Sequence, residues 1–107
     1  MTASQRPRRF RHLPLADVAS RPLPVAVSLP SRLLGLALLR PERAGEGLVI
    51  PRCRSVHTFG MRFPIHVVFC DERLRPISVH GSVPPRRVVR DRRAAAVVEL
   101  PAVGRTG

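Results

Sequence analysis

After Leu48 the chain is a series of short, strand-like apolar segments that are separated by prolines and polar turns. The clearest segment is Ile65–Cys70, where Ile65, Val67 and Phe69 share one face and the other face is nearly as apolar. We therefore expect a strand that is covered on both sides. Shorter strands are predicted at Leu48–Ile50, Ile77–Val83, Val88–Val89 and Ala94–Leu100, each ended by proline or by a polar turn.

A helical period occurs once, between Ser28 and Arg40. Ser28 suits an N-cap and Pro41 follows the last turn, so one short helix is predicted. Its apolar stripe consists of Leu29, Leu33, Leu36 and Leu39. In the preceding segment, 13–27, the prolines at 14, 22 and 24 exclude a helix and confine any strand to an edge or to Val25–Val27.

The predicted fold is α+β and mainly β: a compact, barrel-like antiparallel or mixed sheet with one short helix. A chain of 107 residues has room for one domain, which we place at residues 13–101. Residues 1–12 are expected to form a basic, disordered tail, and 102–107 a short C-terminal tail.

The charge is strongly basic and comes entirely from arginine. The sequence has 19 Arg and no Lys against seven acidic residues, a net charge of +12. Guanidinium groups match phosphate and carboxylate oxygens two bonds at a time, which favours anionic partners, although a GC-rich coding sequence would also enrich Arg. The residues proposed to bind an anion or a nucleic acid are Arg52, Arg54, Arg86, Arg87, Arg90, Arg92 and Arg93.

The cellular setting is expected to be the cytoplasm. Two cysteines are too few for a disulfide framework, and the N-terminus lacks the pattern of a secretory signal. The longest apolar run, Leu33–Leu39, falls far short of the roughly 20 residues of a membrane span, so no membrane association is predicted.

The segment Cys53–Phe69 contains the run His-Thr-Phe-Gly-Met-Arg-Phe-Pro-Ile at 57–65, which resembles the central motif of domain-of-unknown-function family 192. Upstream, Arg32 followed by Gly35-Leu36 is similar to the Arg-x-x-Gly-Leu of that family, and Val97–Pro101 is similar to its Leu-Glu-Leu-Pro strand. The resemblance implies a compact, barrel-like, mainly β domain, and it implies no established reaction.

Two departures from the family pattern matter. His66 stands where the family usually has Asp. The family also continues with a further turn and a closing strand, whereas this sequence ends at Gly107. An open sheet edge would favour a homo-oligomer or partner docking.

Cys53, His57, His66 and Cys70 together form the ligand set of a zinc site. Residues four apart on a strand are separated by about 13 Å, so each pair would have to fold back on itself to share an ion, and no metal site is predicted. Cys53 lies between two arginines that would lower its thiol pKa, with His57 as a base, but no orienting carboxylate stands nearby. We expect no catalytic residue and no cofactor, and we do not expect the protein to be an enzyme. A Cys/His-dependent enzyme or metal protein is kept as an alternative, after the two functions described next.

The leading hypothesis is a non-catalytic accessory or interaction domain that binds a protein or small ligand. Its candidate ligand-binding residues are His57, Thr58, Phe59, Met61 and His66. The alternative for this segment is that Phe59, Met61 and Phe63 alternate into the core while His57 caps a backbone group. The second function considered is an Arg-rich, non-specific nucleic-acid-binding protein.

Overall fold

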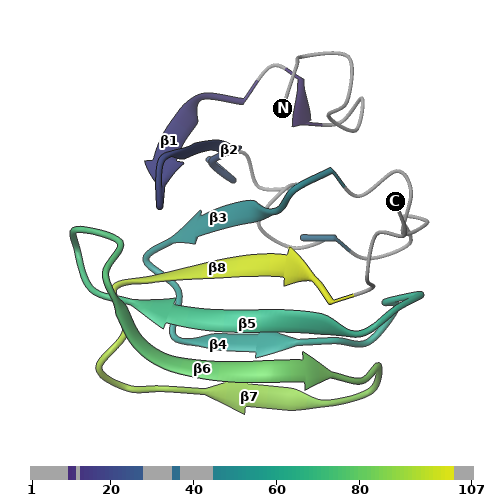
Figure 1. Ribbon diagram of the computed structural model, residues 1–107. Helices are drawn as coiled ribbons and strands as arrows, with labels where there is room; N and C mark the ends of the chain where they lie inside the picture. Colours follow the sequence, from purple (N-terminus) through teal and green to yellow (C-terminus); the bar gives the residue numbers. More distant parts are fainter. Residues whose placement is uncertain (1–9, 12, 28–34, 37–44, 103–107) are drawn as a thin grey trace.

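The computed structural model describes residues 10–11, 13–27, 35–36 and 45–102. These residues form eight β-strands in three antiparallel sheets (Figure 1). The strands are β1 (Leu15–Val18), β2 (Arg21–Pro24), β3 (Leu48–Pro51), β4 (Ser55–His57), β5 (Ile65–Cys70), β6 (Pro76–Val83), β7 (Val88–Arg90) and β8 (Ala96–Pro101).

The largest sheet has four strands in the order β3-β8-β5-β6. The last strand in sequence, β8, is inserted between β3 and β5, so Val98 pairs with Val49 on one side and with Val68 on the other. The strict alternation in β5 places Ile65, Val67 and Phe69 on one fully buried face. Apart from His66 of β5 and Glu99 of β8, both interior strands carry apolar residues on both faces, as is usual for strands covered from two sides.

The β1–β2 hairpin lies beside β3, at the top of Figure 1. Its two turn residues, Ala19 and Ser20, both have positive φ (49° and 66°), which matches the right-handed twist of a tight hairpin. Val25 continues from β2 into an isolated parallel bridge with Val49 of β3. The prolines of β2 are accommodated because a two-stranded sheet consists of edge strands.

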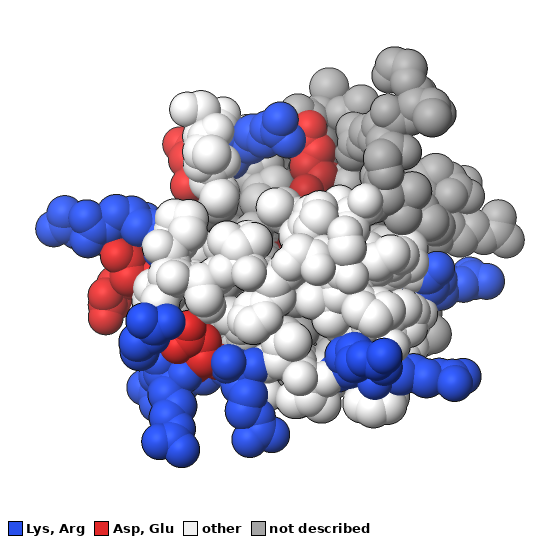
Figure 2. Space-filling model, turned by 60° about the horizontal axis from the view of Figure 1, so that its bottom comes forward, with Lys and Arg blue, Asp and Glu red and all other residues white. Residues whose placement is uncertain are grey.

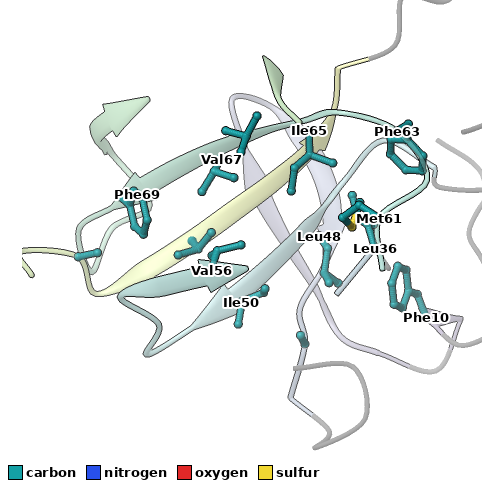
Figure 3. Packing of buried hydrophobic residues seen from close by; sticks show 14 of the residues in the cluster. Phe10, Leu36, Leu48, Ile50, Val56, Met61, Phe63, Ile65, Val67 and Phe69 are labelled. Carbon is teal, nitrogen blue, oxygen red and sulfur yellow. The ribbon is translucent and has the colours of Figure 1, made fainter. Parts of the chain in front are cut away.

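The core consists of two clusters on opposite faces of the four-stranded sheet. The first cluster lies against the β4–β7 pair and extends from Phe69 to Phe10 and Phe63 (Figure 3). Its buried members are Phe10, Leu13, Ala26, Leu36, Leu48, Ile50, Val56, Met61, Phe63, Ile65, Val67, Phe69, Val83, Ala94 and Val97. The second cluster joins Leu23 of the hairpin to Val49, Cys70 and Val98. Each large apolar side chain buried in this way contributes about 1.5–3 kcal/mol.

One carboxylate lies inside this core. Glu99 of β8 is almost fully buried, and its Oε1 accepts a hydrogen bond from the backbone N–H of Leu36 at 3.3 Å. The contact connects two segments 63 positions apart in sequence. Gly35 has φ +51° and approaches so closely that a Cβ there would lie 2.6 Å from Glu99 Oε1. The backbone conformation therefore favours glycine, and a side chain at this position would have to displace the Glu99 carboxylate.

The mainly β prediction is confirmed, and the predicted strands coincide with β3, β5, β6, β7 and β8 to within two residues. The barrel-like arrangement is wrong for the described strands, because β1–β2 and β4–β7 pair separately and the sheets do not close. The predicted helix at 28–40 lies outside the described residues except for 35–36, which form a turn. The predicted tails also lie largely outside them, but Phe10 is described and is fully buried. In the described part of the chain, no helix is long and apolar enough to span a membrane.

Candidate functional site

The β4–β7 pair is a short two-stranded ribbon with one buried side and one exposed side. Val56 and Val89 are cross-strand partners and pack against the first cluster. Because side chains alternate across a strand, the flanking residues point to solvent. We call this exposed side the outer face; it consists of the cross-strand pairs Ser55–Arg90 and His57–Val88.

Thr58 fixes one end of the ribbon. Its hydroxyl donates to the carbonyl oxygen of Pro84 at 2.7 Å and accepts from the backbone N–H of Arg87 at 2.8 Å. The backbone N–H of Thr58 donates to the Arg87 carbonyl, also at 2.8 Å. Thr58 is completely buried, so this candidate ligand-binding residue instead ties the end of β4 to the loop that precedes β7.

A turn after Thr58 directs Phe59 outward. The Met61 N–H donates to the Thr58 carbonyl at 3.2 Å, and Gly60 takes a positive φ of 81°. Phe59 is 53% exposed, whereas Met61 and Phe63 point into the first cluster. The alternative that Phe59 would alternate into the core is thus wrong, because this turn interrupts the two-residue period.

Phe59 and His57 form an exposed aromatic pair. Their ring centroids are 6.1 Å apart with an interplanar angle of 41°. His57 lies on the outer face and does not point into the core. Beside it, Val88 is 49% exposed, which leaves an aliphatic surface next to the two rings.

His66 belongs to a different part of the molecule. It lies on β5, and its Nδ1 accepts a hydrogen bond from the backbone N–H of Ser82 at 3.0 Å. The five candidate ligand-binding residues therefore do not form one groove. His57 and Phe59 share a surface, Thr58 and Met61 are buried, and His66 binds the backbone of β6.

The candidate arginines lie at both ends of the ribbon, and all seven are exposed. At one end, the Arg54 carbonyl accepts from the Asp91 N–H at 2.9 Å, and the Arg52 N–H donates to the Ala95 carbonyl at 2.8 Å. These contacts bring Arg52 and Arg54 to the turn that carries Arg90, Arg92 and Arg93. Arg86 and Arg87 lie at the other end, beside Thr58. Figure 2 shows the basic side chains projecting in separate groups around an uncharged surface.

Asp91 is the one acidic residue between Arg73 and Val98, and it is already engaged. It accepts hydrogen bonds from Arg93 Nη2 at 2.9 Å and from the Ser78 hydroxyl at 2.8 Å. The Arg93 side-chain hydrogen bond, followed by the Arg93 backbone N–H and Ser78, holds the pKa of Asp91 far below its ordinary range. Asp91 consequently orders its own turn and pairs with Arg93, while the neighbouring arginines remain directed to solvent.

The two cysteines are free and pack in different clusters, Cys53 against the first and Cys70 within the second. The Cys53 thiol donates to the Ser55 carbonyl at 3.2 Å in the segment before β4. Cys70 is buried at the end of β5, where burial and then the Asp71 charge raise the pKa of its thiol. A raised thiol pKa disfavours the nucleophilic thiolate. Among the described residues, no three His, Cys, Asp or Glu side chains gather as a metal-binding group.

Sequence reasoning missed Ser55 and Val88 as surface residues of the site. A signal was present only around Val56, where polar Ser55 and His57 flank an apolar residue, because Val88 and Val89 are both apolar. Two three-residue strands are too short for such alternation to be recognised without knowing that they pair.

Two solved structures share this fold. A protein from Sinorhizobium meliloti 1021, provisionally described as a transcription regulator, superposes with a TM-score of 0.61 at 20% identity, covering 82% of this chain and 77% of its own. A protein of unknown function from Novosphingobium aromaticivorans DSM 12444 gives a TM-score of 0.59 at 15% identity, covering 81% and 69%. At these identities the likeness concerns the fold alone. No protein-family model and no curated protein sequence matches the chain.

Proposed function

We propose that this chain is a non-catalytic interaction domain that binds nucleic acid through the outer face of the β4–β7 ribbon and the arginines at its two ends. The observation that supports this best is the position of seven exposed arginines at the two ends of the ribbon, where the carboxylate of Asp91 is already held by Arg93 and Ser78. Guanidinium groups stay charged at any physiological pH and bind phosphate oxygens in pairs.

The local charge balance favours a polyanion. No acidic residue occurs from Gly47 to Cys70, and that segment contributes three arginines. Residues 84–96 add five more against Asp91 alone. Like charges at this density repel one another, and a phosphate backbone would relieve the repulsion while releasing its own counterions.

A small-ligand groove built from the five candidate residues receives less support, because Thr58 and Met61 are buried and His66 is bound to Ser82. The provisional description of the Sinorhizobium protein as a transcription regulator agrees with a nucleic-acid partner. Membership of family 192 stays a prediction that rests on the sequence run at 57–65.

The test is fluorescence anisotropy with labelled oligonucleotides at several salt concentrations. With about five phosphate contacts, affinity for a single strand is expected to fall roughly 100-fold between about 50 and 200 mM salt. Replacing Arg54 or Arg90 by Gln should reduce the slope of log affinity against log salt by about 0.7–0.9.

The matched control is Arg21→Gln, which removes the same charge from the exposed hairpin strand β2. It should leave the salt slope nearly unchanged. Equal losses in the Arg21 and Arg90 variants would assign binding to net charge and not to this face. No binding at low salt, or equally tight binding of poly-glutamate, would overturn the proposal.

A further inference from the structure

We infer that the outer face binds single-stranded nucleic acid and that a base stacks on Phe59. This inference rests on the proposed function and specifies its ligand. Phe59 differs from the other three phenylalanines of the chain, Phe10, Phe63 and Phe69, which are at most 3% exposed. Tyrosine and tryptophan are absent from the sequence, so Phe59 is the one benzenoid ring that the chain presents to solvent.

The exposure of Phe59 is imposed by well-fixed neighbours. The residue before it, Thr58, is anchored through hydrogen bonds to Pro84 and Arg87. Met61, two residues later, is buried in the first cluster. With both sides of the turn held, the ring is positioned before a ligand arrives, which lowers the entropic cost of binding.

The surroundings of Phe59 suit an unpaired nucleotide. His57 provides a second ring with nitrogen atoms that can reach a base edge, at a centroid distance of 6.1 Å. Arg86 and Arg87 are on the loop bonded to Thr58, and Arg90 lies opposite Ser55 at the far end of the ribbon. At about 3.3 Å per residue, the Cα atoms of Ser55 and His57 are about 7 Å apart, so the arginines at the two ends of the ribbon are close enough to contact phosphates of one strand.

A duplex fits this surface less well. Base-pair faces in a duplex are covered by the neighbouring pairs, so Phe59 would have no base to stack on unless the strands separated. Stacking on an aromatic ring is tolerant of sequence because every base has a π-face, so the inferred binding has little base preference.

The experiment compares four probes of equal length in anisotropy titrations: a single strand of oligo(dT), the same phosphate chain with abasic sites, the corresponding duplex and poly-glutamate. Phe59→Ala should weaken oligo(dT) binding roughly 5- to 100-fold and leave abasic binding unchanged. Leu15→Ala is the control, because Leu15 is a comparably exposed apolar residue on β1. Circular dichroism should confirm that both variants keep the fold.

A second readout uses Phe59→Trp, which introduces the sole tryptophan of the chain. Its emission should be quenched by oligo(dT) and not by the abasic strand. Equal affinity for oligo(dT) and the abasic strand, tighter binding of the duplex, or an unaffected Phe59→Ala variant would each overturn the stacking inference while leaving charge-driven binding intact. Failure of every nucleic-acid probe at low salt would instead remove the proposed function itself.

Discussion

The hydroxyl of Thr58 accepts a hydrogen bond from the backbone N–H of Arg87 at 2.8 Å, across 29 positions of sequence. The same hydroxyl donates to the Pro84 carbonyl at 2.7 Å, so one buried side chain satisfies both a donor and an acceptor of the β6–β7 loop. This arrangement fixes the distance between the loop that carries Arg86 and the turn that carries Phe59.

Replacing Thr58 by Val should destabilise the domain. Valine has nearly the same shape but leaves the Arg87 N–H and the Pro84 carbonyl without these partners in a partly buried place. The expected loss in the free energy of unfolding is about 1–3 kcal/mol, measured by urea denaturation. Thr58→Ser keeps the hydroxyl and should lose no more than about 1 kcal/mol, the value of one buried methyl group. Equal losses in the two variants would contradict a role for the hydrogen bonds.

The pH dependence of stability should report on Asp91. Its hydrogen bonds with Arg93 and Ser78 lower its pKa in the folded state, whereas the unfolded chain binds the proton at an ordinary pKa of about 3.9. The stabilisation is therefore complete above about pH 5 and is lost progressively as the pH falls toward the lowered pKa of the folded state. In the Asp91→Asn variant, the melting temperature should fall less steeply with decreasing pH below about pH 4. Thermal melts between pH 7 and 2 measure this dependence. Asp17→Asn, an exposed carboxylate on β1, is the control; a similar flattening in both variants would argue against the Asp91 network.

Replacing Gly35 by alanine should destabilise the domain. Alanine at φ +51° costs about 1–2 kcal/mol from backbone strain alone. Its Cβ would in addition displace the Glu99 carboxylate, which accepts from the Leu36 N–H. Gly81→Ala is the matched control, because a Cβ there would lie 3.8 Å from His66 Nδ1, an ordinary contact distance. Chemical denaturation should show a clear loss for Gly35→Ala and a change near zero for Gly81→Ala, and similar stabilities would contradict the close packing of Gly35.

The outer edge of β6 is expected to mediate weak self-association, since this strand ends the four-stranded sheet in the described part of the chain. Val79 on this strand is 63% exposed, and the strand carries no acidic residue or arginine. Because the chain is strongly positive, added salt should strengthen the association, opposite to its effect on nucleic-acid binding. Light scattering over a concentration series should show that Val79→Lys abolishes it. Val27→Lys adds the same charge outside the strands and should leave the self-association unchanged. If the unmodified protein is a monomer at every protein and salt concentration, the expectation is refuted.

Much of the four-stranded sheet could be predicted from the sequence. The alternation in Ile65–Cys70 is strong because every second residue is a large apolar side chain that the first cluster buries. The β1–β2 hairpin escaped prediction because its turn is formed by Ala19 and Ser20, which adopt positive φ without the usual Asn-Gly signal.

The site was predicted only in part. The Arg-rich segments were recognised, but their gathering depends on the pairing of Ser55 with Arg90, a long-range contact that no local pattern encodes. The outward position of Phe59 depends likewise on the bonds from Thr58 to a loop that lies 26 to 29 residues away. Composition could therefore indicate the chemistry of the surface, while its geometry required the tertiary fold.

Strand β8 gives the domain a particular mechanical property. Val97 belongs to the first cluster and the adjacent Val98 to the second, so consecutive side chains of one strand serve two separate compartments. Loss of β8 would disrupt both clusters, because side chains from this one strand pack into each of them. The β1–β2 hairpin and the β4–β7 ribbon do not pair directly with each other, but they pack on opposite faces of the sheet that contains β8. They should therefore unfold in a single cooperative step.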